Sequence, residues 1–179
     1  MIDLKSDVLE RGVLKALDDA ARQQEMRERF DVAACELDRK LATEPDLLLA
    51  WQTIPLESYD IELPEQIRSS WIFILRARVA TIPERHPNSH QRMMAYRGTG
   101  DFQVWDGAAW RSNHLAGDFN RPLEKRWISI PTNYWHRSMN PPENLVVVSF
   151  HTATEEDLIE ENGDPLTSAP THQRRYARV

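Results

Sequence analysis

Glu84-Arg85-His86 opens the stretch that decides the fold, ERHPNSHQ, which ends at Gln91. A second stretch, PTNYWHRSMN, begins at Pro131 and contains His136. Because successive side chains of an extended strand point to opposite faces, Glu84 and His86 would share one face. A carboxylate and two imidazoles that converge from two strands form a facial metal site with open positions. The pattern therefore predicts a divalent metal centre, with non-heme Fe(II) among the candidates.

Around these stretches the chain has the sequence pattern of a β protein. Short runs of β-branched, aromatic and apolar residues alternate with turn residues, and Asp106-Gly107 is a strong hairpin signal. About six short strands at this spacing indicate a sandwich or a small barrel. The runs cover residues 70–80, 92–96, 101–105, 108–112, 126–130 and 144–150.

The N-terminal part has a helical pattern instead. Apolar residues recur at helical spacing over residues 8–43, and a break is expected around 23–29. Pro45-Asp46 is expected to start a short helix over 47–52, and Thr154 to cap a last acidic helical turn. The predicted organisation is a helical N-terminal segment over 1–65, packed on a barrel over 66–153, then a short helix and tail over 154–179.

Composition narrows the class of protein. The 179 residues carry a net charge of -6 at pH 7, which argues against nucleic acid or an anionic membrane as the main partner. The apolar runs are too short to span a bilayer, and the first residues lack the pattern of a signal peptide. With Cys35 as the single cysteine, no intrachain disulfide forms and a cytoplasmic setting is expected.

The spacing of the two stretches resembles the two sequence motifs of the cupin superfamily. The first motif is usually His-x-His, three or four residues, Glu, six residues and Gly; the second is Pro-x-Gly-x2-His-x3-Asn. Glu84 stands at the first His, Gln91 at the Glu and Asn133 at the Gly, while Gly98 and Asn140 match. Asn tolerates a left-handed turn better than most residues. The resemblance implies a mainly β, single-domain cupin: a double-stranded β-helix, or jelly-roll barrel.

Within that superfamily the likeness is closest to cysteine dioxygenase and related thiol dioxygenases, which implies oxygen chemistry at iron. That family uses three histidines, whereas Glu84 occupies the first position here. Its Ser-His-Tyr set would fall on Val147, Ser149 and His151, which cannot reproduce it. The Glu-x-His pair also resembles the manganese cupins that hydrolyse ureidoglycine, which implies a non-redox alternative.

Several side chains have two possible roles. Gln91 is expected to be a fourth ligand or to hold a metal-bound water, and His90 is its rival. His151 either points into the barrel as a base or caps the end of its strand in solvent. Arg76, Arg78 and Arg97 either lie at the surface or supply the cation for an anionic substrate.

These observations predict a metal-dependent cupin enzyme that acts on a small, anionic molecule. The first hypothesis is a non-heme Fe(II) dioxygenase with ligands Glu84, His86, His136 and Gln91, in which Gln91 and His151 assist catalysis. The second is an Mn(II)- or Zn(II)-dependent lyase, isomerase or aminohydrolase that uses the same site. The third is a ligand-binding cupin without turnover. The resemblance also implies a homodimer.

Overall fold

Four nested antiparallel strand pairs organise the chain. The computed structural model describes residues 7–139, 141–167 and 172–175. A tight turn at Asp106-Gly107, where Gly107 has a φ of 101°, forms the tip of the innermost pair. From the tip outward the pairs are β5 (Thr99–Trp105) with β6 (Trp110–Ala116), β4 (Gln91–Arg97) with β7 (Trp127–Ile130), β3 (Glu84–Arg85) with β8 (His136–Met139), and β2 (Ser69–Leu75) with β9 (Leu145–His151).

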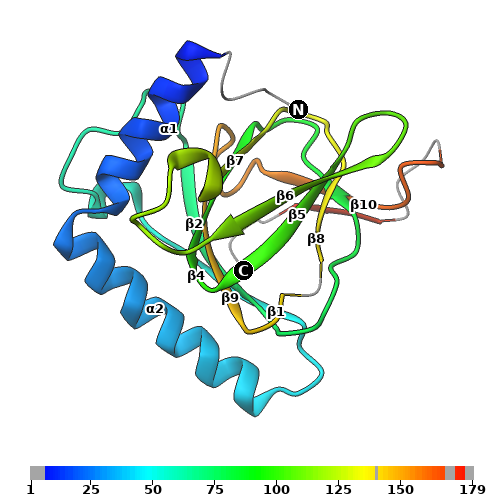
Figure 1. The fold of residues 1–179 in the computed structure, drawn as a ribbon, viewed down its shortest axis with the longest axis horizontal. Coiled ribbons are helices and arrows are strands. Elements are labelled where there is room, and N and C mark those ends of the chain that lie inside the picture. The colour runs from blue at the N-terminus through cyan, green and yellow to red at the C-terminus, as the bar shows by residue number, and fades with distance from the viewer. Residues whose placement is uncertain (1–6, 140, 168–171, 176–179) are drawn as a thin grey trace.

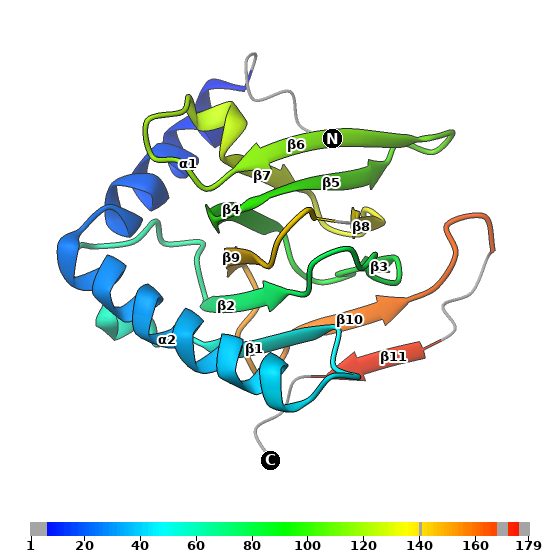
Figure 2. The ribbon, with the colours of Figure 1, turned by 60° about the horizontal axis from the view of Figure 1, so that its bottom comes forward.

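This nesting places alternate pairs in two facing sheets (Figure 2). One sheet has the order β1-β2-β9-β4-β7 and is called here the helix-side sheet; the other has the order β11-β10-β3-β8-β5-β6 and is called the outer sheet. The eight strands β2 to β9 are thus one long hairpin rolled into two sheets, which is a jelly roll. The added edge strands are β1 (Leu49–Thr53), β10 (Ile159–Asn162) and β11 (His172–Arg175).

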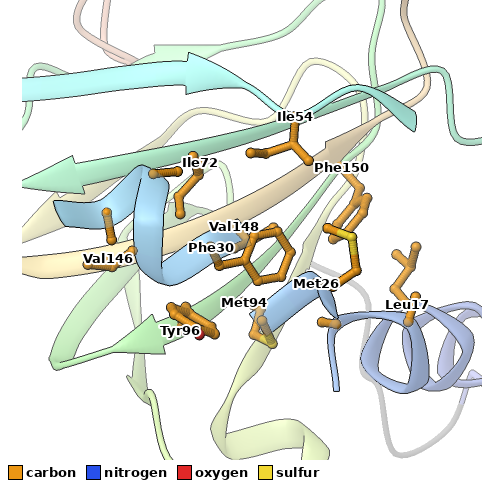
Figure 3. Close-up of a cluster of buried hydrophobic side chains, with 14 of the residues drawn as sticks. Leu17, Met26, Phe30, Ile54, Ile72, Met94, Tyr96, Val146, Val148 and Phe150 are labelled. Atoms are coloured by element: carbon orange, nitrogen blue, oxygen red, sulfur yellow. The ribbon is translucent and has the colours of Figure 1, made fainter. Parts of the chain in front are cut away.

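Two helices cover the outward face of the helix-side sheet (Figure 1). α1 (Val8–Ala21) begins at Asp7, whose side chain accepts a hydrogen bond from the Glu10 backbone, and α2 (Gln24–Thr43) follows after a two-residue break. Figure 3 shows Phe30 of α2 among apolar side chains of β4 and β9. Two short 3-10 helices lie in loops, at Leu56–Ser58 and Leu123–Lys125.

The central strands β9 and β4 of the helix-side sheet are buried on both faces. Every residue of β9 is buried, as is every residue of β4 except Arg97. Alternate side chains of β9 pack either with the helices, as Val148 does, or inside the barrel, as Val147 does. A strand covered on both faces loses the polar-apolar alternation of a half-exposed strand. This explains the unbroken apolar run in β9.

The structure confirms the predicted mainly β architecture with N-terminal helices, but it corrects three local predictions. Residues 47–52 are expected as a helix, but 49–52 belong to β1 instead. The first predicted strand ends at Leu75, and Arg78 adopts a left-handed φ of 63°. Thr154 does accept a hydrogen bond from the Asp157 backbone, but this turn leads into β10 rather than a helix.

Along the described ranges, each helix is too short or too polar to cross a membrane.

Buried ion pairs join α1 to the sheet. Asp18 accepts hydrogen bonds from Trp127 at 2.9 Å and from Arg22 at 2.8 Å, and its Oδ1 lies 2.5 Å from Arg126. Glu10 binds Arg92 through two hydrogen bonds of 2.7 and 2.8 Å. Burial alone would raise the pKa of Asp18, but the hydrogen bonds from Arg126, Arg22 and Trp127 outweigh it and lower that pKa.

We predict that Asp18→Asn lowers the free energy of unfolding by about 3–5 kcal/mol at pH 7, because it leaves the buried Arg126 without its counter-charge. The folded-state pKa of Asp18 lies below its ordinary value of 3.8, so its contribution is present above that pH and lost as pH falls through the lowered value. The difference from wild type in urea unfolding should therefore shrink in acid.

The control is Asp19→Asn, which removes an exposed carboxylate bonded to Lys15 on the same helix. It should change the free energy of unfolding by less than about 1 kcal/mol. Equal effects of the two substitutions at pH 7 would contradict the buried ion-pair interpretation.

Candidate metal centre

Strand pairing brings the two sequence stretches together. Glu84 on β3 pairs with His136 on β8 in the outer sheet. His86 follows β3 directly, and its carbonyl accepts a hydrogen bond of 2.9 Å from the Asn133 backbone. Asn133 has a φ of 71°, so the left-handed turn expected there is present. The turn that precedes His136 is thus hydrogen-bonded to the backbone of His86.

Glu84, His86 and His136 each offer one ligand atom, and these atoms lie within 4.8 Å of one another. The Nε2 atom of His136 is 3.2 Å from Oε1 of Glu84. Both histidines are buried, with exposed fractions of 5% and 3%, whereas Glu84 is partly exposed. The structure therefore brings together the three residues predicted as ligands.

Hydrogen bonds fix how the two imidazoles are presented. Nδ1 of His86 lies 3.0 Å from the Ile159 carbonyl, and Nδ1 of His136 lies 3.1 Å from the Tyr134 carbonyl. A carbonyl only accepts, so in the neutral form of each ring Nδ1 carries the proton and Nε2 keeps a lone pair. Both Nε2 atoms are buried without a hydrogen-bond partner. Backbone-oriented imidazoles with a bare nitrogen are typical of metal-binding histidines.

Electrostatics keep the rings of His86 and His151 neutral. Burial, reinforced by His136, lowers the pKa of His86 to about 4 even though Glu84 acts in the opposite direction. Burial, with the neighbouring His86 and His136, also lowers the pKa of His151 well below its ordinary value. At pH 7 both rings are therefore neutral, as a metal ligand or a general base must be.

The three residues line a cavity of about 280 Å³ between the two sheets. Gln91 and His151, which pair with each other in the helix-side sheet, line the same cavity and are buried. Oε1 of Gln91 has no hydrogen-bond partner, and the His151 ring centroid lies 5.1 Å from that of His86. Of the two positions considered for His151, the structure has the one that points into the barrel.

Other predicted site residues lie elsewhere. His90 is not a rival ligand, because its Nε2 is 2.7 Å from Oγ of Ser129 and 3.7 Å from Glu10 of α1. Arg76 donates to carbonyls at the end of α2, and Arg97 pairs with Asp38 of the same helix. Arg78 does not line the cavity either. The arginines proposed to bind an anionic substrate are therefore absent from it. Asn140 lies outside the described residues.

Two parts of the candidate site were not predicted from the sequence. Ser138 lines the cavity and lies two residues after His136, so the two-residue period of a strand could have placed it on the same face. Ile159, Glu160 and Asn162 belong to β10, which was predicted as a helix and tail. The turn residues Gly163-Asp164-Pro165 after it were the available signal for a strand.

No family model matches the chain, and no curated protein sequence matches it. Among solved structures, it is similar to the capsular polysaccharide assembling protein CapF from Staphylococcus aureus over 61% of this chain and 29% of that one, with a TM-score of 0.47 and 13% identity. It is similar to pumpkin seed globulin over 64% of this chain and 28% of that one, with a TM-score of 0.48 and 19% identity. It is also similar to an oxalate oxidase in complex with the substrate analogue glycolate, over 62% of this chain and 54% of that one, with a TM-score of 0.47 and 13% identity.

The chain thus spans less than two thirds of the length of each of these proteins. With TM-scores below 0.5, these likenesses establish neither an activity nor a ligand. The jelly-roll description rests on the strand order of the chain itself.

Asn133 provides a test of whether the left-handed turn before His136 is required for stability. We predict that Asn133→Gly retains the free energy of unfolding to within about 1 kcal/mol, because Gly adopts positive φ without steric cost. Asn133→Val should lower it by about 1–2 kcal/mol or more, because a β-branched residue is strained there. Thermal and urea unfolding of both variants measure the difference. Equal stability of the Gly and Val variants would show that the left-handed turn is not required.

Proposed function

We propose that the chain is a metal-dependent cupin enzyme that holds one divalent cation through Glu84, His86 and His136. The observation that carries the proposal is the pair of buried Nε2 atoms that make no hydrogen bond, one of them 3.2 Å from a carboxylate oxygen of Glu84. Leaving buried polar nitrogens unsatisfied costs free energy, and a cation would satisfy both at once. The match to the cupin motif spacing and the jelly-roll strand order support the family assignment.

A carboxylate and two imidazoles on one side leave coordination positions open toward the cavity. Fe(II), our first choice, would supply oxygen chemistry there, while Mn(II) or Zn(II) would supply Lewis acidity. Glu84 would partly neutralise the charge of the cation. The metal identity decides between a dioxygenase and a lyase, isomerase or aminohydrolase.

The residues opposite the three ligands have distinct roles in this proposal. Gln91 reaches the cavity with an unpartnered amide oxygen, which can orient a bound water or a donor group of the substrate. His151 is neutral, and its ring nitrogens lie 3.4 Å from the hydroxyls of Ser89 and Ser149. These long contacts leave His151 able to accept a proton from a substrate in the cavity.

Elemental analysis tests the metal assignment. Wild-type protein purified without added metal, then loaded and dialysed, should hold about one divalent ion per chain and melt at a higher temperature than chelator-treated protein. His136→Ala and Glu84→Ala should each weaken metal binding at least about 100-fold, beyond the usual effect of losing a residue that only orients a ligand.

The matched control is Glu160→Gln, which changes another carboxylate of the same cavity that is not in the ligand cluster. It should retain the metal. Circular dichroism must show that all variants fold. Full metal retention by both ligand variants, or no binding of Fe(II), Mn(II) or Zn(II) by the wild type, would overturn the proposal and favour a binding protein without a metal.

A further inference from the structure

The walls of the cavity are largely apolar away from the three candidate ligands. Trp71 and Phe73 of β2 and Met93 of β4 line it from the helix-side sheet, and Phe102 of β5 lines it from the outer sheet. Trp51 of β1 also lines it, with its ring 5.0 Å from that of Trp71 in an edge-to-face arrangement. Such surfaces favour a flat or bulky apolar body, because burying apolar area is the main source of affinity.

Two polar atoms interrupt these walls without partners in the protein. Oε1 of Gln91 and Oγ of Ser138 are buried and make no hydrogen bond, and they come from opposite sheets. Buried polar groups are normally satisfied, so both atoms are available to a ligand. An amide oxygen accepts only, which calls for an N–H or O–H group on that ligand.

Away from the candidate metal ligands, the side chains of the cavity do not favour an anionic group on the ligand. Among the described residues that line it, Arg137 is the one arginine or lysine. Its guanidinium donates two hydrogen bonds to Oε1 of Gln103, at 3.0 and 2.8 Å, and lies 4.1 Å from the centre of the Trp110 ring. Arg137 is thereby held by neighbours outside the cavity, whereas Glu84 and Glu160 both line it. A carboxylate on the body of a ligand would lie near acidic groups, and the guanidinium of Arg137 is already engaged elsewhere.

We infer that the site takes a small molecule with an uncharged aromatic or bulky apolar body and a polar head that carries a hydrogen-bond donor. The inference builds on the proposed function, because the head would lie at the Glu84, His86 and His136 cluster. A volume of about 280 Å³ is at the lower end for ligand pockets, so the body is the size of a single ring. This substrate class replaces the anionic one expected from the sequence.

Three hydroxamic acids with the same chelating head test this inference. Benzohydroxamic acid carries an uncharged ring, acetohydroxamic acid only a methyl group, and 4-carboxybenzohydroxamic acid an anionic ring. Calorimetry on metal-loaded protein should show that benzohydroxamic acid binds at least about tenfold more tightly than either of the others. Comparable affinity for the methyl probe, or tighter binding of the carboxylated probe, would overturn the inference.

Substitutions in the cavity wall test which side chains produce the preference for the phenyl probe. Trp51→Ala and Phe73→Leu, which remove apolar surface from the cavity, should each reduce the preference for the phenyl over the methyl probe at least about threefold. Trp105→Ala is the control, because Trp105 packs on Trp110 and does not line the cavity. An unchanged preference in both cavity variants, with folding intact, would place the probe elsewhere and refute the inference.

The same probes distinguish this inference from the metal assignment. In metal-free protein all three should bind more weakly, but the preference for the phenyl probe should persist, because the apolar walls do not depend on the cation. Protein that holds no metal yet keeps this preference would refute the proposed function alone. Protein that holds metal without the preference would refute the substrate class alone.

Discussion

The pairing of β3 with β8 is the constraint on which the candidate site depends. In a rolled hairpin, residues far apart in the chain meet at positions symmetric about the tip, and the Asp106-Gly107 turn is that tip. Glu84 therefore faces His136 because of where the hairpin turns. The Asn133 hydrogen bond to the His86 carbonyl then fixes the third member. Convergence of the three side chains follows from topology.

The doubly buried sheet joins this site to the helices. Neighbouring residues of β4 point in opposite directions: Gln91 reaches the cavity, whereas Arg92 binds Glu10 of α1. His90 also takes part on the helix side, through Ser129. The ion pair of Glu10 with Arg92, buried under α1, holds that helix against β4, whose other face forms part of the cavity wall. The helix-side sheet thus packs against the helices on one face and supplies Gln91 and His151 to the cavity on the other, while the candidate ligands come from the outer sheet.

Much of this arrangement could be predicted from the sequence, and the failures have physical causes. Two-residue periodicity and motif spacing were enough to single out Glu84, His86 and His136, because strand geometry is regular. Arg76 was ambiguous, since charge alone does not reveal that it binds the carbonyls at the end of α2. β1 and β10 were taken for helices because short acidic or Leu-rich segments fit both patterns, and pairing with a distant strand decided the outcome.

The carbonyl of Ile159, which orients His86, comes from β10, after all the candidate ligands in the chain. Proteins are synthesised from the N-terminus, so a nascent chain exposes Glu84, His86 and His136 before that carbonyl exists. Its two histidines would be present, but His86 would lack the carbonyl that orients its ring. Capture of the proposed cation would therefore wait until translation has passed β10, which would favour loading of the finished protein over loading at the ribosome.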